Sequence, residues 1–433
     1  MNDYAYVARP RDAHTKHAPL TQCNLCSYSS INGVASCANS YLLNDVIRGQ
    51  WDRTDAVITS DCDAVKFMMG EPMNLPDRES AAIAAIKGGL DIEMGNNLTT
   101  ETFGRAVEDG RLDKEDIIKV WRRSFAPLFR SGRFDPKEFD EWRKLDKAVI
   151  NSTAHQQISL EAALMGNVLL KNEKSILPLE AGKNIAVLGP FAAAGNVSDS
   201  YLSDYAADQT CFNEWSCIHN FFDEIAYLNE RDGSGSTTTS AGVGISDYTS
   251  DPLNTNILDA LEKARKSDVV ILCLGIDRSI EFEGTDRFDT KLPGMQESFA
   301  KQILALKKPT VLVLVNGGAL AIDNLIEGST AIIEAFNPGV LGAKALSQLM
   351  FGKENKWGRL PVTMYPHDYV YQQNMLNYDM ARWPGRTYKY YVGGQPLFKF
   401  GHGLSLTTFE NDCVVSEVEK KVKITCNVTN AGR

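Results

Sequence analysis

Two groups of carboxylates lie where enzymes commonly carry catalytic acids and bases. Asp61 directly follows the apolar run 56–60, where a buried strand is expected to end. In a βα barrel the active site is built at the carboxyl ends of the strands, although an acidic residue after a strand more often caps a helix. The second group follows another expected strand, in the segment SIEFEGTDR, and consists of Glu281, Glu283, Asp286 and Arg287.

The crowding of charge within 279–287 can separate the pKa values of its carboxyl groups. A neighbouring carboxylate raises the pKa of a carboxyl group, and a neighbouring arginine lowers it. Two carboxyl groups that face each other across a cleft between domains suit glycosidic cleavage, one as nucleophile or base and the other as proton donor. A glycosidase is therefore one hypothesis for these two groups, with a helix cap at Asp61 and a solvated surface loop at 279–287 as the alternatives.

Up to residue 130 the chain alternates short apolar runs with helical patterns. The runs 23–28, 56–60 and 89–94 each lead into a polar or turn-like segment, which is typical of βα units. A helix is predicted over 113–130, with Asp113 as its cap and an apolar face formed by Ile117, Trp121, Phe125 and Leu128. Residues 131–155 are charged and polar, and we assign them to a linker.

Residues 156–365 predict a second domain, an α/β sandwich with a largely parallel sheet. A helix is expected over 156–171, and continuous apolar runs, typical of strands covered on both faces, follow at 185–189, 268–275, 310–315 and 331–335. Helical patterns at 295–307 and 341–351 supply the crossovers. The polar stretch 190–255, rich in Gly, Ser and Thr, is interpreted as a long insertion rather than core.

From residue 366 to 433 the pattern changes to aromatic and β-branched alternation, which indicates the beginning of an all-β domain. The whole chain is therefore of the α/β class, with β structure at its C-terminal end. Its 45 basic and 55 acidic residues give a net charge of −10 without a basic tract, which argues against a nucleic-acid partner. The apolar runs are shorter than the roughly 20 residues that span a bilayer, so we expect a soluble protein without a membrane partner.

Cysteines and glycosylation sequons bear on the compartment. Nine cysteines are too few for a disulfide scaffold, but local bridges Cys26–Cys37 and Cys211–Cys217 are possible, with buried free thiols as the alternative. No leader with a charged start and an apolar core precedes the chain as given. Acceptor sequons, which are suggestive of secretion, occur at Asn97, Asn151, Asn196 and Asn427.

A series of collinear motifs extends over nearly the whole chain beyond residue 20. The motifs are LCSYSSINGVASCANSYLLNDVIRGQW, VITSDCDAV, LLKNEKSILPL, IAVLGP, IEFEGTDR with LPGMQ, VNGGALAI, AFNPGVLGAKAL, FGKENKWGRLPVTMYP and PGRTYKYYVGGQPLFKFGHGLSLTTF. Together they resemble the family 3 glycoside hydrolases, in particular their β-xylosidase branch.

The resemblance implies a (β/α)8 barrel, of which 1–130 is the C-terminal part, then the α/β sandwich and the start of a fibronectin type III-like β-sandwich. It also implies a secreted, retaining exo-β-glycosidase that needs no metal and no cofactor and acts on oligosaccharides. By the motifs, Asp61 is the nucleophile and Glu283 the acid/base, held protonated by an enclosed site, with Glu281 as the fallback. Tyr28 lines the sugar pocket, and His402 is expected to be a structural turn residue.

The chain departs from the family pattern at both ends. About three of eight barrel strands are expected, and the residues that grip the terminal sugar are missing; Lys16 and His17 lie too close to the first motif to replace them. Two hypotheses follow: a fragment of a β-xylosidase, with α-L-arabinosyl or β-glucosyl residues as other substrates, or a catalytically incomplete product that at most binds sugar. The presence of both Asp61 and Glu283 favours the first. Selectivity for the leaving group is expected to depend on the loop 190–255.

Overall fold

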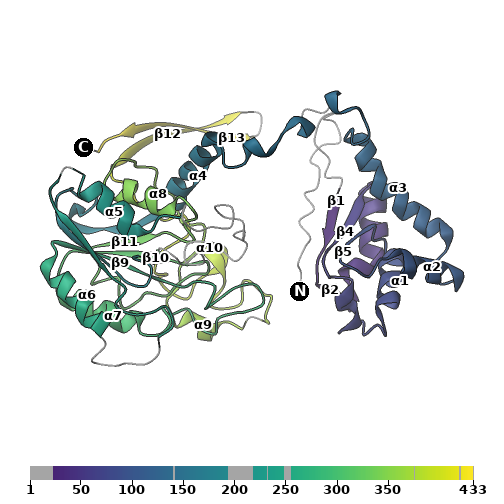
Figure 1. Ribbon diagram of the computed structural model, residues 1–433, viewed down its shortest axis with the longest axis horizontal. Coiled ribbons are helices and arrows are strands. Elements are labelled where there is room, and N and C mark those ends of the chain that lie inside the picture. The colour runs from purple at the N-terminus through teal and green to yellow at the C-terminus, as the bar shows by residue number, and fades with distance from the viewer. Residues whose placement is uncertain are drawn as a thin grey trace. The chain divides into compact units, whose positions relative to one another are not determined.

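The computed structural model describes residues 23–139, 142–193, 218–231, 233–247, 255–374, 376–418 and 421–432. The chain divides into two compact units, Met1–Val149 and Ile150–Arg433 (Figure 1). Each unit has its own buried hydrophobic clusters, so each is described by itself. Within the described residues, no helix is both long and apolar enough to cross a membrane.

The first unit contains a three-stranded parallel sheet in the order β1-β4-β5. Its strands, β1 (Cys23–Cys26), β4 (Val57–Cys62) and β5 (Ile92–Met94), lie in the three apolar runs expected from the sequence. The other regular elements are the short hairpin β2 (Ser30–Ile31) and β3 (Val34–Ala35), a π-helical segment Tyr41–Gln50, and the helices α1 (Arg78–Gly88), α2 (Thr100–Glu108) and α3 (Lys114–Arg130).

The sequence explains where α1 begins and ends. The Asp77 side chain accepts a hydrogen bond of 2.7 Å from the backbone N–H of Ser80, which caps the first turn. Gly89 follows the helix in the left-handed region, with φ of 111°, and its N–H bonds back to the carbonyl of Ala85. Asp77 therefore marks where the helix begins, and Gly89 marks where it ends, three residues before β5 starts at Ile92.

Helix α3 has the predicted length but does not bury its predicted face within this unit. Only Val120 is buried, whereas Trp121 is 56% exposed and stacks on Phe125 at 4.8 Å between ring centroids. Asp113 occupies the cap position, but its side chain makes no hydrogen bond to the helix. Helical periodicity therefore predicted the helix correctly, while burial depends on neighbours that periodicity does not specify.

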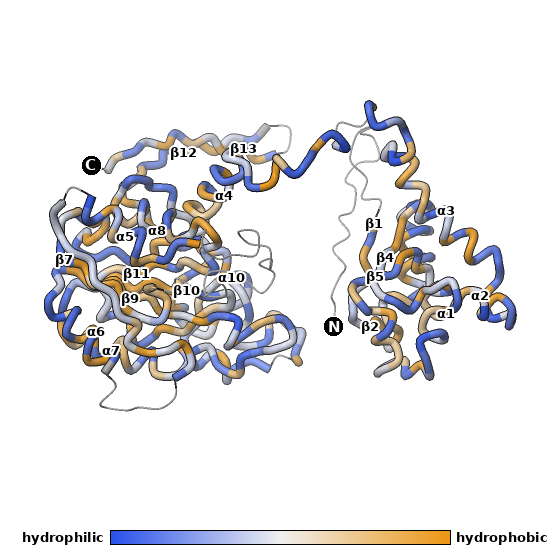
Figure 2. Tube along the Cα trace, viewed as in Figure 1, coloured by the Kyte–Doolittle hydropathy of each residue, from blue (hydrophilic) through white to orange (hydrophobic). Residues whose placement is uncertain are grey.

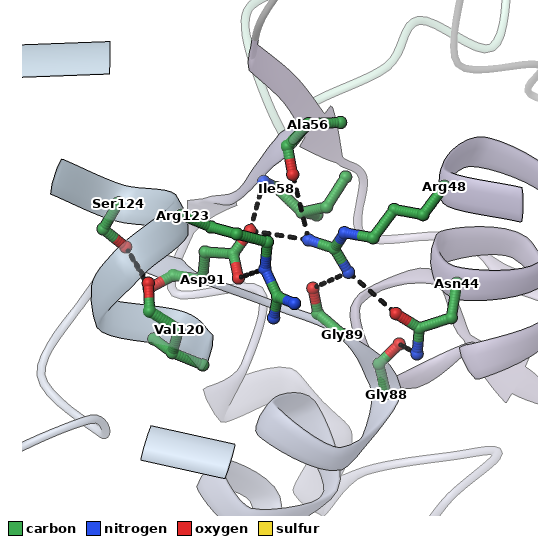
Figure 3. A network of polar contacts seen from close by, with 10 residues as sticks. All are labelled: Asn44, Arg48, Ala56, Ile58, Gly88, Gly89, Asp91, Val120, Arg123 and Ser124. Carbon is green, nitrogen blue, oxygen red and sulfur yellow. Dashed lines mark hydrogen bonds and ion pairs between the residues drawn. The ribbon is translucent and has the colours of Figure 1, made fainter. Parts of the chain in front are cut away.

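A buried ion network joins the amino ends of β4 and β5 to two helices (Figure 3). The Asp91 carboxylate accepts hydrogen bonds of 2.6 Å from both Arg48 and Arg123, and one of 2.9 Å from the N–H of Ile58. Arg48 also donates to the carbonyl of Ala56, which directly precedes β4. Burial raises the pKa of Asp91, an effect that the two guanidinium groups oppose. These contacts fix the amino ends of β4 and β5 to the two helical segments that carry Arg48 and Arg123.

The second unit is a six-stranded sheet in the order β6-β11-β10-β9-β7-β8, in which every neighbouring pair is parallel except β6 and β11. The strands are β6 (Val168–Asn172), β7 (Asn184–Leu188), β8 (Ser236–Ser240), β9 (Val269–Gly275), β10 (Thr310–Val315) and β11 (Ala331–Glu334). Figure 2 shows hydrophobic residues concentrated along the central strands β9, β10 and β11.

Helices cover both faces of this sheet, as the continuous apolar strands require. One face packs against α4 (Thr153–Gly166), α5 (Phe221–Asn229) and α8 (Gly342–Met350), and the other against α6 (Thr255–Lys266) and α7 (Gln296–Ala305) (Figure 1). The mostly parallel α/β sandwich predicted from the sequence is therefore present.

Two sequence interpretations in this unit were wrong. The predicted helix 156–171 ends at Gly166, and 168–172 is the antiparallel strand β6, because a short apolar run at a helix end can belong to either structure. The stretch 190–255 is not one insertion, since it contains α5 and the polar strand β8. β8 is an edge strand that pairs only with β7, so it carries no apolar signal.

The end of the chain contains two short helices and a long hairpin. The helices are α9 (Tyr369–Gln372) and α10 (Thr387–Tyr390), and the hairpin pairs β12 (Phe409–Val418) with β13 (Lys421–Asn430). A disulfide between Cys413 and Cys426 joins its strands, a pairing that the sequence did not indicate. The remaining short 3₁₀ turns are Ser36–Ala38, Lys66–Met69, Lys137–Phe139, Trp142–Lys144, Lys147–Val149 and Glu173–Ser175.

Candidate active site

Asp61 lies at the carboxyl end of β4, as its position after an apolar run predicts. The strand is buried from Val57 to Ser60, and Asp61 is the first residue at which it becomes partly exposed. One Asp61 carboxylate oxygen accepts a 2.7 Å hydrogen bond from the N–H of Cys62. The preceding Ser60 hydroxyl accepts 2.8 Å from the N–H of Met94, which ties the ends of β4 and β5 together. The carboxylate is thus presented at the edge of a fixed sheet.

Tyr28 follows the neighbouring strand at the same edge. Cys26, the last residue of β1, is paired with Ser60, so Tyr28 and Asp61 both leave the sheet at its carboxyl end. The Tyr28 ring is 47% exposed and meets Phe67 edge to face at 5.6 Å between centroids. The Cys26–Cys37 disulfide, one of the two expected local bridges, anchors the loop that carries Tyr28.

Glu93, in the third strand of the same sheet, is a carboxylate that the sequence did not single out. It accepts hydrogen bonds of 2.8 and 2.6 Å from the N–H groups of Asn97 and Leu98, and it also contacts the side-chain amide of Asn97. These contacts make Glu93 an anchor for the loop after β5. They also bury the sequon asparagine Asn97, which is 2% exposed.

Glu281 and Arg287 lie in the second unit, in the loop that follows β9. One Glu281 oxygen accepts a 2.6 Å hydrogen bond from the N–H of Gly318, and the other accepts from the Nε of Arg287. Arg287 is largely buried and donates 3.1 Å to the carbonyl of Ala319. Glu281 therefore joins its own loop to the segment after β10 and is engaged at both oxygens.

Glu283 lies two residues further on, at the tip of a tight turn. Phe282 and Thr285 exchange backbone hydrogen bonds of 3.2 and 2.9 Å, and Gly284 between them has φ of 81°, in the left-handed region that glycine adopts without strain. The Glu283 side chain is exposed in its unit, so the second unit alone does not form the enclosed site expected around it.

Gln296 positions the start of this loop, a role that its place in the LPGMQ motif did not reveal. It is fully buried, and its side-chain amide bonds both backbone groups of Gly275, accepting 2.9 Å from the N–H and donating 2.8 Å to the carbonyl. Because Gly275 is the last residue of β9, Gln296 holds the point where the chain leaves the sheet for Glu281.

Glu334 is another carboxylate that the sequence analysis did not single out, because it lies inside an apolar run. It ends β11, is 1% exposed, and accepts 3.1 Å from the N–H of Phe336. Burial raises the pKa of Glu334 to about 8, against the smaller opposing effects of that N–H and of Asn316. At neutral pH it is therefore a largely protonated carboxyl group at the carboxyl edge of the sheet.

The histidine assignments are simpler. His402 bonds the carbonyl of Leu170 through Nε2 at 2.8 Å, consistent with the structural role expected of it. Across the described residues, no group of three His, Cys, Asp or Glu side chains is arranged to hold a metal ion. Lys16, His17 and the Cys211–Cys217 pair lie outside the described residues.

Residues 167–406 match the family model described as the glycosyl hydrolase family 3 C-terminal domain. The chain belongs to glycoside hydrolase family 3. The matched range begins beside β6 and ends before the β12–β13 hairpin, so it contains the whole six-stranded sheet and the loop with Glu281 and Glu283.

Plant relatives carry xylosidase names. This family 3 chain is 32% identical over 416 residues to "Beta-D-xylosidase 1" of Arabidopsis thaliana, covering 94% of the chain and 51% of that relative. It is 33% identical over 402 residues to "Beta-xylosidase/alpha-L-arabinofuranosidase 1" of Medicago sativa subsp. varia, covering 90% and 49%. The chain thus spans about half the length of the curated relatives it matches.

Solved structures with similar folds include both xylosidases and glucosidases. A GH3 exo-beta-xylosidase, XlnD, in complex with a xylobiose aziridine activity-based probe aligns with TM-score 0.79 and 28% identity over 90% of this family 3 chain and 49% of that one. A β-glucosidase from Erythrobacter marinus aligns with TM-score 0.77 and 29% identity, covering 94% and 56%. The similarity supports glycoside hydrolysis as the family chemistry and leaves the sugar to be decided by experiment.

Proposed function

We propose that the protein is a retaining exo-β-glycosidase that removes terminal β-D-xylosyl residues, with α-L-arabinosyl residues as a second substrate, from oligosaccharides of xylan breakdown. The observation that carries the proposal is the place of Asp61, at the carboxyl end of a parallel strand and at the same sheet edge as Tyr28. The xylosidase and arabinofuranosidase names of the plant relatives support the choice of sugar.

In this proposal Asp61 is the nucleophile. Ionised, it attacks the anomeric carbon and forms a glycosyl–enzyme intermediate, while an acid protonates the departing oxygen. The same acid, now a base, then deprotonates the water that releases the sugar, so the anomeric configuration is retained. Tyr28 supplies an aromatic wall to the sugar pocket at the sheet edge.

We assign the acid/base role to Glu283 rather than Glu281. An acid that exchanges its proton twice per turnover needs an oxygen that can reach the substrate. Both oxygens of Glu281 are engaged, one by the N–H of Gly318 and the other by the Nε of Arg287. Glu283 lies at the tip of a turn and is exposed, and it is the glutamate that matches the acid/base position of the family motif best.

The domain assignment is part of the same proposal. Residues 1–130 are the C-terminal part of a (β/α)8 barrel, 131–155 a linker, 156–365 the α/β sandwich, and 366–433 a linker with the start of a fibronectin type III-like domain. Support comes from the parallel order β1-β4-β5 in the first unit and from the antiparallel β12–β13 hairpin.

We also propose that the protein is secreted and glycosylated. Disulfides persist in oxidising compartments, and the described residues contain two, Cys26–Cys37 and Cys413–Cys426. The sequon residue Asn427 is exposed on β13, which suits modification, whereas Asn97 is buried against Glu93.

Hydrolysis of aryl β-xyloside and aryl β-glucoside by the purified 433-residue chain tests the function. We expect xyloside turnover. Asp61→Ala should abolish this turnover while the melting temperature stays within a few degrees, whereas Asp63→Asn, two residues further on, should largely preserve it. NMR of the first-formed product reports retention or inversion. Faster glucoside turnover identifies a β-glucosidase, and a folded chain without turnover supports a catalytically incomplete product that at most binds sugar.

A further inference from the structure

An aromatic cavity lies beside the loop of Glu281 and Arg287, wholly within the second unit. Its volume is about 270 Å³, and its lining includes Leu320, Tyr365, Tyr369, Val370, Gln373 and Arg386. A cavity of roughly 150 Å³ in an apolar core is enough to bind benzene. This cavity is therefore large enough for one six-membered ring with a substituent.

The cavity and the Glu281–Arg287 pair share one segment of backbone. Gly318 donates to Glu281 and the Ala319 carbonyl accepts from Arg287, while Ala319 and the next two residues line the cavity. Thr290, another lining residue, accepts a 2.8 Å hydrogen bond at its carbonyl from the N–H of Ala321. A ligand in the cavity would thus lie next to the loop that presents Glu283.

The aromatic wall is held rigidly before any ligand binds. Tyr365 and Tyr369 stack at 3.9 Å with an interplanar angle of 6°, and Tyr391 meets both rings edge to face. The Tyr369 hydroxyl donates 3.0 Å to the carbonyl of Gly385, and the Tyr365 hydroxyl accepts 2.6 Å from the N–H of Thr387. Preorganised rings reduce the entropy lost on binding.

The polar side chains that line the cavity are those of Thr290, Gln373, Arg386 and the two tyrosines. Arg386 is its charged lining residue, fixed by a 2.7 Å hydrogen bond to the carbonyl of Asn374, and Gln373 lies beside it. Among the described residues that line the cavity there is no carboxylate. A sugar ring presents hydroxyl groups on every side and needs several acceptors, whereas a phenolic ring needs flat apolar contact and one donor for its oxygen.

We propose that this cavity is a binding site for the aromatic ring of an aryl, phenol-type leaving group. The ring lies against the tyrosine wall, and the phenolic oxygen accepts from Arg386. This inference rests on the proposed function for its biological meaning, because a leaving group presupposes the glycosidase activity. The binding itself can be measured without any turnover.

The test is equilibrium binding of 4-nitrophenol to the full 433-residue chain, followed by isothermal titration and by saturation-transfer NMR. We expect binding that Tyr369→Ala weakens at least tenfold. Val370→Phe narrows the cavity without removing a tyrosine and is expected to weaken binding of 4-nitrophenol similarly. This variant tests the site even if Tyr369→Ala does not fold. Tyr371→Ala, an exposed tyrosine of the same helix α9 outside the lining, is the matched control and should bind unchanged.

Methyl β-D-xyloside is the second probe. If it binds instead of 4-nitrophenol and with the same dependence on Tyr369, the ligand class is wrong. If neither probe binds, or if Tyr369→Ala and Val370→Phe bind 4-nitrophenol as well as the unaltered chain, the site is wrong. Turnover of glycosides without phenol binding overturns this inference and leaves the proposed function intact. Phenol binding without turnover supports this inference and counts against the proposed function.

Discussion

Glu281 accepts a hydrogen bond from the guanidinium of Arg287, six residues further along the same loop. The N–H of Gly318, in the segment after β10, donates to the same carboxylate, so one carboxylate joins this segment to the loop. Glu283 lies between the two paired residues in sequence and is carried on the turn that they hold. The pair gives Glu281, the fallback for the acid/base in the sequence analysis, a structural role: it fixes the loop that carries Glu283.

Glu283→Gln should impair glycosides with poor leaving groups by about 10²–10⁴-fold in turnover, because general acid catalysis contributes that much. Activated dinitrophenyl glycosides need no protonation of the leaving oxygen, so their first step should be nearly unaffected. The measurement is the ratio of turnover numbers for the two substrate classes. Glu281→Gln is the comparison variant and should lower both classes together with the melting temperature. A selective loss in Glu281→Gln would reverse the assignment.

Gly318→Ala should destabilise the second unit by about 1–3 kcal/mol, the usual cost of overpacking. A Cβ at this position would lie 2.6 Å from both the Arg287 Nη2 and a Glu281 oxygen. Urea denaturation measures the loss. Gly166→Ala, at the end of α4, is the matched control, since a Cβ there meets nothing within 4 Å, and it should be neutral or slightly stabilising. Equal stability of the two variants would contradict the structural role of the pair.

Asp91→Ala should destabilise the first unit by about 3–5 kcal/mol, because it leaves two guanidinium groups without their buried partner. Arg48 and Arg123 both contact this carboxylate, and its side chain is fully buried. Glu101→Ala, which removes an exposed ion pair with Arg105, should cost less than about 1 kcal/mol. Chemical denaturation followed by a probe in the first unit gives both values, and a small effect at Asp91 would show that the network is dispensable.

Glu334 should make the stability of the second unit depend on pH. Its folded pKa of about 8 lies above its ordinary value of 4.5, so the folded state retains a proton that the unfolded chain loses between these two values. The contribution of Glu334 to the free energy of unfolding is therefore greatest below pH 4.5. This contribution is lost as the pH rises through about 8, with a slope of at most about 1.4 kcal/mol per pH unit.

Glu334→Gln should remove this slope, since the amide oxygen can still accept from Phe336 and no proton is exchanged. Urea midpoints measured at intervals between pH 5 and 9 check the prediction. Glu262→Gln changes an exposed carboxylate on α6 and serves as control, with the slope expected to persist. An unchanged slope in Glu334→Gln would mean that another group titrates in this range.

The sequence by itself determined the α/β class, the central strands and the place of Asp61. Strands β7, β9, β10 and β11 are covered on both faces, so each is a continuous apolar run that can be recognised without its neighbours. Asp61 was found in the same way, because a carboxylate directly after such a run must lie at a strand end. The motifs along nearly the whole chain added the family, since so many in one order are specific.

Tertiary structure alone decided the elements and contacts that depend on distant partners. The polar strand β8 is a strand because β7 offers it an edge, and β6 is a strand because it pairs antiparallel with β11. The roles of Glu281, Gln296 and Asp91 follow from hydrogen bonds to residues 21 to 43 positions away in sequence. The physical reason is that the pattern of apolar residues in a buried strand can be recognised from neighbouring residues in the sequence. A buried polar group, in contrast, is hydrogen-bonded only by a partner that folding brings to it.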